Sequence, residues 1–149
     1  MKAVRTWILI ADAGRARVLE NLGPGKGAHE VAAMASHADL PRTHDLVTDR
    51  QPRVHESGNA TRHAIEPKTD PHEQLKQRHL EAIAAHVDAS LAAEAFDRLV
   101  VVAPPHALGI LRAAFTDRVR KVVTGELAKD LTKTPDHELG SHLADLVRL

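Results

Sequence analysis

Three histidines recur at intervals of seven residues and form the first pattern in this chain that could do chemistry. They are His72, His79 and His86. Seven residues of α-helix span roughly 10 Å, whereas two metal ligands on one helix are normally placed at positions i and i+4. The spacing therefore predicts a solvated helix flank, and we expect neither a metal nor another cofactor.

An acid at the end of an apolar run is the second candidate. Asp12 follows such a run, but a metal-dependent nuclease would need partner carboxylates on neighbouring elements, and Leu99–Ala103 carries none. We interpret Asp12 as a turn residue. The alternative is a hydrolase of esters or phosphodiesters, with Asp12, His63 and Glu66 as candidate catalytic residues beneath the polar segment 36–70.

Basic residues gather over positions 112–121, where Asp117 is the only acid among them. Such a group could bind phosphates, because each neutralised phosphate adds salt-dependent affinity. A solvated helix face is the competing interpretation. Residues of segment 36–70 would extend the group if that segment folds back, and His106 lies where a strand ends. The candidate binding residues are Arg50, Arg53, Arg62, His63, His106, Arg112, Arg118, Arg120 and Lys121.

Composition restricts the classes of function. The formal net charge is zero, so attraction to nucleic acid or membrane would need a local patch. Aromatic residues make up 2% of the chain, which nearly excludes a surface that stacks bases. Cysteine is absent, and the apolar run 6–11 is too short to cross a membrane. We expect a cytoplasmic protein without membrane insertion, either a monomer or a weak homodimer.

Hydrophobic patterning predicts one α/β domain over residues 1–149. Continuous apolar runs at 6–11 and 99–103 are typical of buried strands. The first is expected to pair with residues 16–22 in a hairpin, followed by a weaker strand at 29–35. An irregular segment, 36–70, precedes a helix capped by Asp70 that runs to about residue 94. We expect further helices over 105–121, with Pro105 in the first turn, and from Thr134 as cap, with a short strand within 122–131.

Five stretches in the same order resemble one bacterial family. They are A-D-A-G-R-A-R-V-L-E (11–20), T-D-R-Q-P-R (48–53), S-G-N-A-T-R-H-A-I-E-P (57–67), L-V-V-V-A-P-P-H-A-L-G-I-L-R (99–112) and K-D-L-T-K-T-P-D-H-E-L (129–139). Together they resemble the host attachment proteins, described as required for attachment to host cells. Gln51-Pro52 is a departure, since the family usually has Pro-Gly there. The most specific pieces are A-P-P-x-x-L-G-x-L-R and K-D-L-T.

The family is similar in turn to the central domain of archaeal and eukaryotic peptide-chain release factors. That resemblance implies a ribonuclease H-like three-layer α/β/α sandwich, with a mixed sheet of about five strands and a long irregular loop after the third. Release-factor domains carry a Gly-Gly-Gln tripeptide for peptidyl-tRNA hydrolysis, and this chain has none. The resemblance therefore implies binding to the ribosome or RNA without release activity.

The main functional hypothesis is a non-enzymatic cytoplasmic binding module associated with RNA, the ribosome or a translation-related protein. It would use the 112–121 face and the 41–70 segment, and attachment would follow indirectly. The hydrolase is one alternative, and a factor directly involved in attachment to host cells is another. The turn after Leu99–Ala103 places Pro104, His106 and Arg112 at the edge of a sheet where α/β proteins commonly bind ligands.

Overall fold

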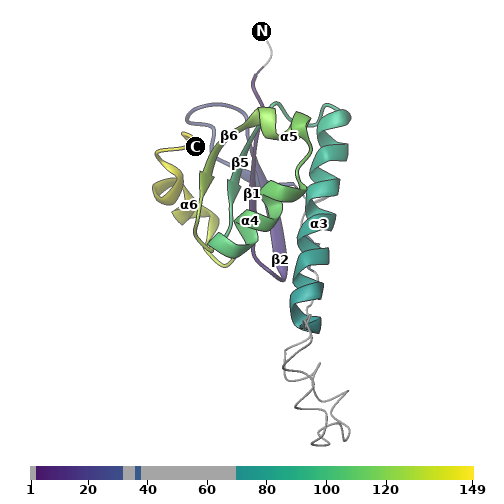
Figure 1. Ribbon diagram of the computed structural model, residues 1–149. Coiled ribbons are helices and arrows are strands. Elements are labelled where there is room, and N and C mark those ends of the chain that lie inside the picture. The colour runs from purple at the N-terminus through teal and green to yellow at the C-terminus, as the bar shows by residue number, and fades with distance from the viewer. Residues whose placement is uncertain (1–2, 32–35, 38–69) are drawn as a thin grey trace, which may run out of the picture.

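A mixed β-sheet forms the centre of the computed structural model, which describes residues 3–31, 36–37 and 70–149 (Figure 1). Its strands pair in the order β3-β2-β1-β5-β6, and a further two-residue strand, β4, also pairs with β2. The strands are β1 (Thr6–Ala11), β2 (Arg15–Asn21), β3 (His29–Glu30), β4 (Ser36–His37), β5 (Arg98–Val102) and β6 (Val123–Leu127).

The two predicted apolar strands lie side by side at the centre of this sheet. β1 pairs antiparallel with β2, which confirms the hairpin, and pairs parallel with β5. β5 pairs parallel with β6, so the predicted strand within 122–131 is also confirmed. Every residue of β1 is buried. Both faces of the central strands must therefore be covered by other elements.

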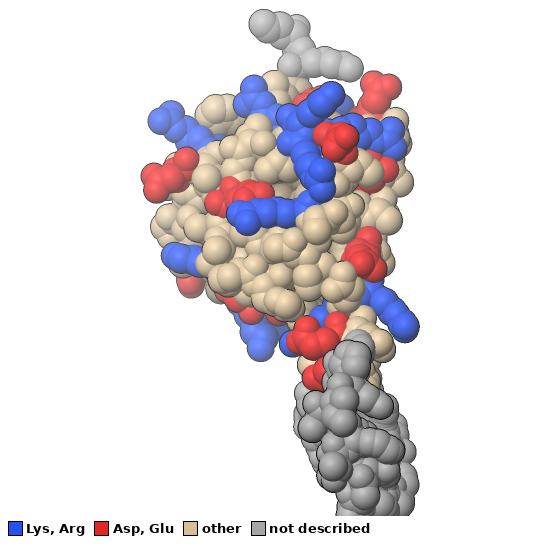
Figure 2. All heavy atoms as spheres, viewed as in Figure 1, with Lys and Arg blue, Asp and Glu red and all other residues tan. Residues whose placement is uncertain are grey.

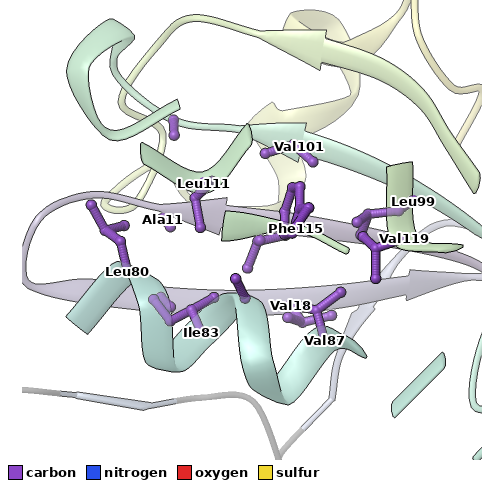
Figure 3. Packing of buried hydrophobic residues seen from close by; sticks show 14 of the residues in the cluster. Ala11, Val18, Leu80, Ile83, Val87, Leu99, Val101, Leu111, Phe115 and Val119 are labelled. Carbon is purple, nitrogen blue, oxygen red and sulfur yellow. The ribbon is translucent and has the colours of Figure 1, made fainter. Parts of the chain in front are cut away.

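Helices cover both faces of the sheet, as Figure 1 shows with the sheet seen between them. They are α3 (Pro71–Ala92), α4 (Pro105–Ala114), α5 (Asp117–Val122) and α6 (Asp136–Leu143). One apolar cluster joins Leu9 and Val101 to Leu80 of α3 and Leu111 of α4 (Figure 3). The other cluster joins alternate residues of the same strands to Leu139 and Leu143 of α6.

The long helix α3 follows the predicted pattern closely. The Asp70 carboxylate accepts a hydrogen bond from the His72 amide at 3.0 Å, which satisfies one free donor at the helix start. Pro71 occupies the first turn, where it loses no hydrogen bond. Leu80, Ile83 and Val87 are buried at helical spacing, as predicted.

The prediction of one helix over 105–121 is wrong in one respect, because the structure has two helices in this range. Phe115 and Thr116 have extended backbones between α4 and α5, and the Thr116 hydroxyl caps α5 by accepting from the Val119 amide. The apolar stripe nevertheless survives the break, since Phe115 and Val119 are both buried in the same cluster. A local capping signal at Thr116 thus overrode a continuous amphipathic pattern.

Three predicted boundaries also differ from the structure. Ser36–His37 is a strand beside Arg15 and Ala16, so the irregular segment does not begin at residue 36. The strand predicted at 29–35 is described only at His29–Glu30. Thr134 does not cap α6, because its carbonyl instead accepts from Arg17 at 2.8 Å and Pro135 occupies the cap position.

The Leu111 side chain tests how strongly α4 depends on the sheet. Leu111 is fully buried in the cluster between α3, α4 and the strands. Leu111→Ala is expected to lower the free energy of unfolding by about 2–5 kcal/mol, because it removes buried methyl groups and leaves a cavity. Leu22→Ala is the matched control, since Leu22 is exposed, and should change stability by less than about 0.5 kcal/mol. Urea denaturation measures both, and equal losses would contradict the packing described here.

The contact between α3 and α5 supplies a pH test. Asp88 accepts hydrogen bonds from Arg118 at 2.6 and 2.9 Å and from the Thr116 hydroxyl at 2.7 Å. The Arg118 guanidinium, followed by Thr116, lowers the pKa of Asp88 from 3.8 to about 2. Because the pKa is lower in the folded state, this contact stabilises the fold above pH 3.8 and stops doing so as the pH falls through about 2.

Asp88→Asn should therefore lower the urea midpoint at neutral pH, and its difference from the wild type should shrink as the pH approaches the folded pKa. Asp145→Asn is the control, because Asp145 is exposed and makes no ion pair within the described residues. A difference of the same size at neutral and at acidic pH would count against the ion pair.

Candidate functional site

Three parallel strands end at one edge of the sheet, which we call the carboxyl edge. Asp12 directly follows β1, Pro104 follows β5 by two residues, and the K-D-L-T segment at 129–132 follows β6. Since β1 pairs parallel with β5, and β5 parallel with β6, these segments meet although they are far apart in sequence. Open α/β sheets commonly bind ligands at this edge.

A hydrogen-bond cluster of Asp12, Asp130 and Thr132, here called the clasp, joins two of these segments. The Thr132 hydroxyl oxygen lies 3.1 Å from Asp12 Oδ2 and 2.6 Å from Asp130 Oδ1. The Thr132 amide donates to the same Asp130 oxygen at 3.0 Å. A threonine hydroxyl has one proton to donate, so it serves one carboxylate at a time. The clasp ties the turn after β1 to the segment after β6.

Both carboxylate oxygens of Asp12 are engaged. Oδ1 accepts from the amides of Gly14 at 2.8 Å and Arg15 at 2.7 Å, while Oδ2 faces Thr132. These bonds are those of a turn residue, in agreement with the interpretation from sequence. The spacing of residues in the sequence did not predict that Asp130 and Thr132 lie beside Asp12. The sequence feature that could have predicted this contact is the position of K-D-L-T after a third parallel strand.

His79 is a correction to the predicted solvated flank. It is buried, and its Nε2 has no hydrogen-bond partner within the described part of the chain. Burial lowers the pKa of His79, and the Arg15 carbonyl and Asp12 carboxylate offset this only in part. His86 is exposed, as predicted. His79 differs because it lies one position before Leu80 and four before Ile83, on the side of α3 that packs on the sheet.

Three exposed cations lie close to the clasp in the chain. Arg15, Lys129 and Lys133 are exposed, and none makes an ion pair within residues 3–31, 36–37 and 70–149. Ala16 packs on the α3 face, so alternation along β2 directs Arg15 toward the α6 face. Arg17, two residues further, bonds the Thr134 carbonyl and Asp136 on that face. Arg15 thus projects toward the face of the sheet on which Arg17 contacts residues 134 and 136.

The predicted basic group at 112–121 has a different electrostatic character. Arg112 donates to Glu126 at 2.9 Å, Arg118 binds Asp88, and Arg120 lies 3.2 Å from Asp117. The three arginine side chains are 57%, 57% and 51% exposed, so each guanidinium is accessible but already carries a carboxylate. Figure 2 shows the resulting mixture of blue and red on this face. Lys121 is exposed and has no ion pair among the described residues.

His106 lies beside the first turns of α3. Its Nε2 is 3.2 Å from Glu73, and the two residues line an open hollow of about 420 Å³ between α3 and the start of α4. Lys76, and to a lesser degree His106, lowers the pKa of Glu73. Asp70, just before these turns, is occupied as the cap of α3. The contact between His106 and Glu73 joins the start of α4 to the first turns of α3.

Several candidate residues cannot be placed. Arg50, Arg53, Arg62, His63 and Glu66 lie outside the described residues. Within the part of the chain that is described, no group of three side chains is arranged to hold a metal ion. No described helix has both the length and the apolar character needed to cross a bilayer.

Comparison with known proteins agrees with the sequence motifs. A search of curated proteins finds no match. The family model described as "Protein required for attachment to host cells" matches residues 7–143, which is most of the chain and includes all the segments that meet at the carboxyl edge. The chain therefore belongs to the family of proteins required for attachment to host cells.

Proposed function

We propose that this protein is a non-enzymatic cytoplasmic module that binds RNA, free or in the ribosome, at its carboxyl edge and thereby contributes indirectly to attachment to host cells. The observation that carries this proposal is a set of exposed cations near the clasp that make no ion pair within the described residues: Arg15, Lys129 and Lys133. Phosphates of a nucleic acid backbone are suitable partners for such charges.

The clasp is what makes this edge a binding surface. Its two carboxylates accept hydrogen bonds from Thr132 and from backbone amides, so their lone pairs are partly satisfied within the protein. The lysines flank the clasp in sequence at positions 129 and 133, and Arg15 donates its backbone amide to Asp12. The clasp therefore orders the backbone from which all three cations project.

The proposal moves the binding surface away from the 112–121 group. Arginines that already hold carboxylates must break those pairs to bind phosphate, which costs part of the binding free energy. Arg15, Lys129 and Lys133 at the carboxyl edge hold no carboxylate from the described part of the chain, so binding through them breaks no ion pair seen there. Because the chain has few aromatic residues, binding would depend on phosphate contacts more than on stacked bases.

The resemblance to release-factor central domains supports RNA as the partner, and a mixed sheet with helices on both faces is compatible with the ribonuclease H-like fold that it implies. A hydrolase receives less support from the described residues. Asp12 Oδ1 accepts hydrogen bonds from two backbone amides, Oδ2 faces the Thr132 hydroxyl, and the nearby His79 is buried beneath the edge rather than exposed to a substrate.

Salt dependence tests the binding surface directly. Three phosphate contacts to a single strand predict that log K falls against log salt with a slope of about −2. Arg15→Glu combined with Lys133→Glu should reduce binding by about tenfold or more at low salt and flatten this slope. Lys26→Glu is the matched control, because Lys26 is exposed in the Gly23–Gly27 turn beside the opposite edge.

Fluorescence anisotropy with labelled RNA and co-sedimentation with ribosomes provide the measurements. The absence of wild-type binding to RNA and ribosomes at low salt would refute the proposal. Each single charge reversal changes the net charge by two, so an equal loss in Lys26→Glu and in Lys133→Glu alone would show that only total charge matters.

Attachment itself can be tested by complementation. Cells that lack this gene should regain attachment to host cells with the wild-type gene or Lys26→Glu, and should fail to regain it with the Arg15→Glu, Lys133→Glu double variant at equal protein level. Full recovery with the double variant would separate the carboxyl edge from attachment. Recovery after adding purified protein to the medium would instead favour a direct role at the cell surface.

A further inference from the structure

A hollow of about 230 Å³ lies at the end of the sheet opposite the carboxyl edge, and we call this end the amino edge. Three of its lining residues form one row across the strands. Thr6 is the first residue of β1, and it pairs with Asn21 of β2 on one side and with Arg98 of β5 on the other. Residues directly opposite each other in neighbouring strands point to the same face of a sheet. The row therefore presents three polar side chains to one side of the sheet.

The row lies on the face that α6 covers. Ile8, Leu19 and Val100 belong to the apolar cluster on that face. Each is two positions from a member of the row, which is the spacing that keeps side chains on one face of a strand. The segment after α6 forms another wall of the hollow, because Leu146 packs so closely on β6 that a Cβ at Gly125 would lie 2.9 Å from it. Figure 1 shows the chain ending beside this edge.

The lining combines positive charge with apolar surface. Arg98 and Arg148 are exposed, and neither makes an ion pair within the described part of the chain. The described residues that line the hollow include no acid, and Asp97, which precedes Arg98, is held by Arg5. An anion with an apolar body matches both properties. The apolar lining residues are Val4, Pro24, Leu146 and Val147.

The Thr6 side chain adds a polar group to this lining. Thr6 is 7% exposed, and its hydroxyl makes no hydrogen bond within the described residues. A nearly buried hydroxyl is stabilised by a hydrogen-bond partner. Asn21, in contrast, uses its side-chain amide in the turn after β2, where it donates to the carbonyls of Gly23 and Gly27. Thr6 is therefore the member of the pair that has a donor left for a ligand.

We propose that the amino edge binds a small organic carboxylate with a short apolar chain, whose carboxylate is held by Arg98, Arg148 and the Thr6 hydroxyl. A guanidinium binds a carboxylate through two parallel hydrogen bonds, and the apolar lining covers the chain of the ligand. The volume is below the roughly 300 Å³ at which sites for drug-sized ligands begin, so the acid is small. This inference is independent of the proposed RNA binding, because the cations of the carboxyl edge do not line the hollow.

Hexanoate is the probe, and NMR titration of the backbone amides of the full chain reports where and how tightly it binds. A dissociation constant of about one millimolar is expected, as the affinity per atom of small ligands allows. The largest shifts should lie around Thr6, Asn21 and Arg98. Acetate should bind at least about tenfold more weakly, since each buried methylene contributes about fourfold. 1-Hexanol should also bind at least about tenfold more weakly, because it has the chain without the charge.

Single substitutions locate the site. Arg98→Gln and Arg148→Gln should each weaken hexanoate binding by about fivefold or more, because each removes a charged donor. Thr6→Val keeps the shape of the side chain but removes the hydroxyl, with an expected loss of about threefold. Arg78→Gln is the matched control and should bind as the wild type does. Arg78 is an exposed arginine of α3 without an ion pair among the described residues, it does not line this hollow, and its substitution changes the net charge equally.

Four results would overturn the proposal. They are no binding of hexanoate at about ten times the expected dissociation constant, an equal loss in Arg78→Gln, equal affinities for hexanoate and 1-hexanol, and tighter binding of inorganic phosphate, which lacks the apolar chain. The urea midpoint identifies any variant that fails to fold. If Arg98→Gln or Thr6→Val unfolds, Arg148→Gln decides, because residue 148 lies outside the helices and strands.

Discussion

Burial of the central strands on both faces is the constraint on which the structure depends. All residues of β1 are buried. Residues 99–103, which are β5 after Arg98 and the first position beyond the strand, are also all buried. Apolar surface on both sides of a strand is stable only when both sides are covered. The helices α3 and α4 cover one face and α6 covers the other, with separate apolar clusters for each. The faces of the sheet are therefore unavailable for chemistry, and its edges are what remain.

The polar residues at those edges follow from the direction of the strands. Parallel pairing of β1, β5 and β6 collects Asp12, Pro104 and the K-D-L-T segment at one end. There Thr132 joins two carboxylates that would otherwise repel each other. The same parallel arrangement leaves β6 last in the sheet, with one side of its backbone unpaired within the described residues. The topology thus accounts for the carboxyl edge, on which we base the proposed function.

Strong local signals predicted most of the fold. Continuous apolar runs identified β1 and β5, and Asp70 followed by Pro71 identified the start of α3, because these signals depend on a few neighbouring residues. Competing local signals caused the errors. Thr116 divides the helix expected over 105–121 by capping α5, and Pro135 instead of Thr134 occupies the cap position of α6. In each case a contact or cap outside the periodic pattern decided the outcome.

For the candidate sites, too, local features could be predicted from the sequence and contacts between distant residues could not. The sequence by itself determined the family, the buried strands, the main helices and the residue types available at each turn. Only the tertiary structure decided which charges neutralise each other. Asp88 binds Arg118 across 30 positions, and Asp12 meets Thr132 across 120. Electrostatic energy depends on distance in space. Sequence spacing therefore could not show that the arginines at 112–120 are paired, whereas Arg15 and Lys133 have no ion-pair partner among the residues that the structure describes.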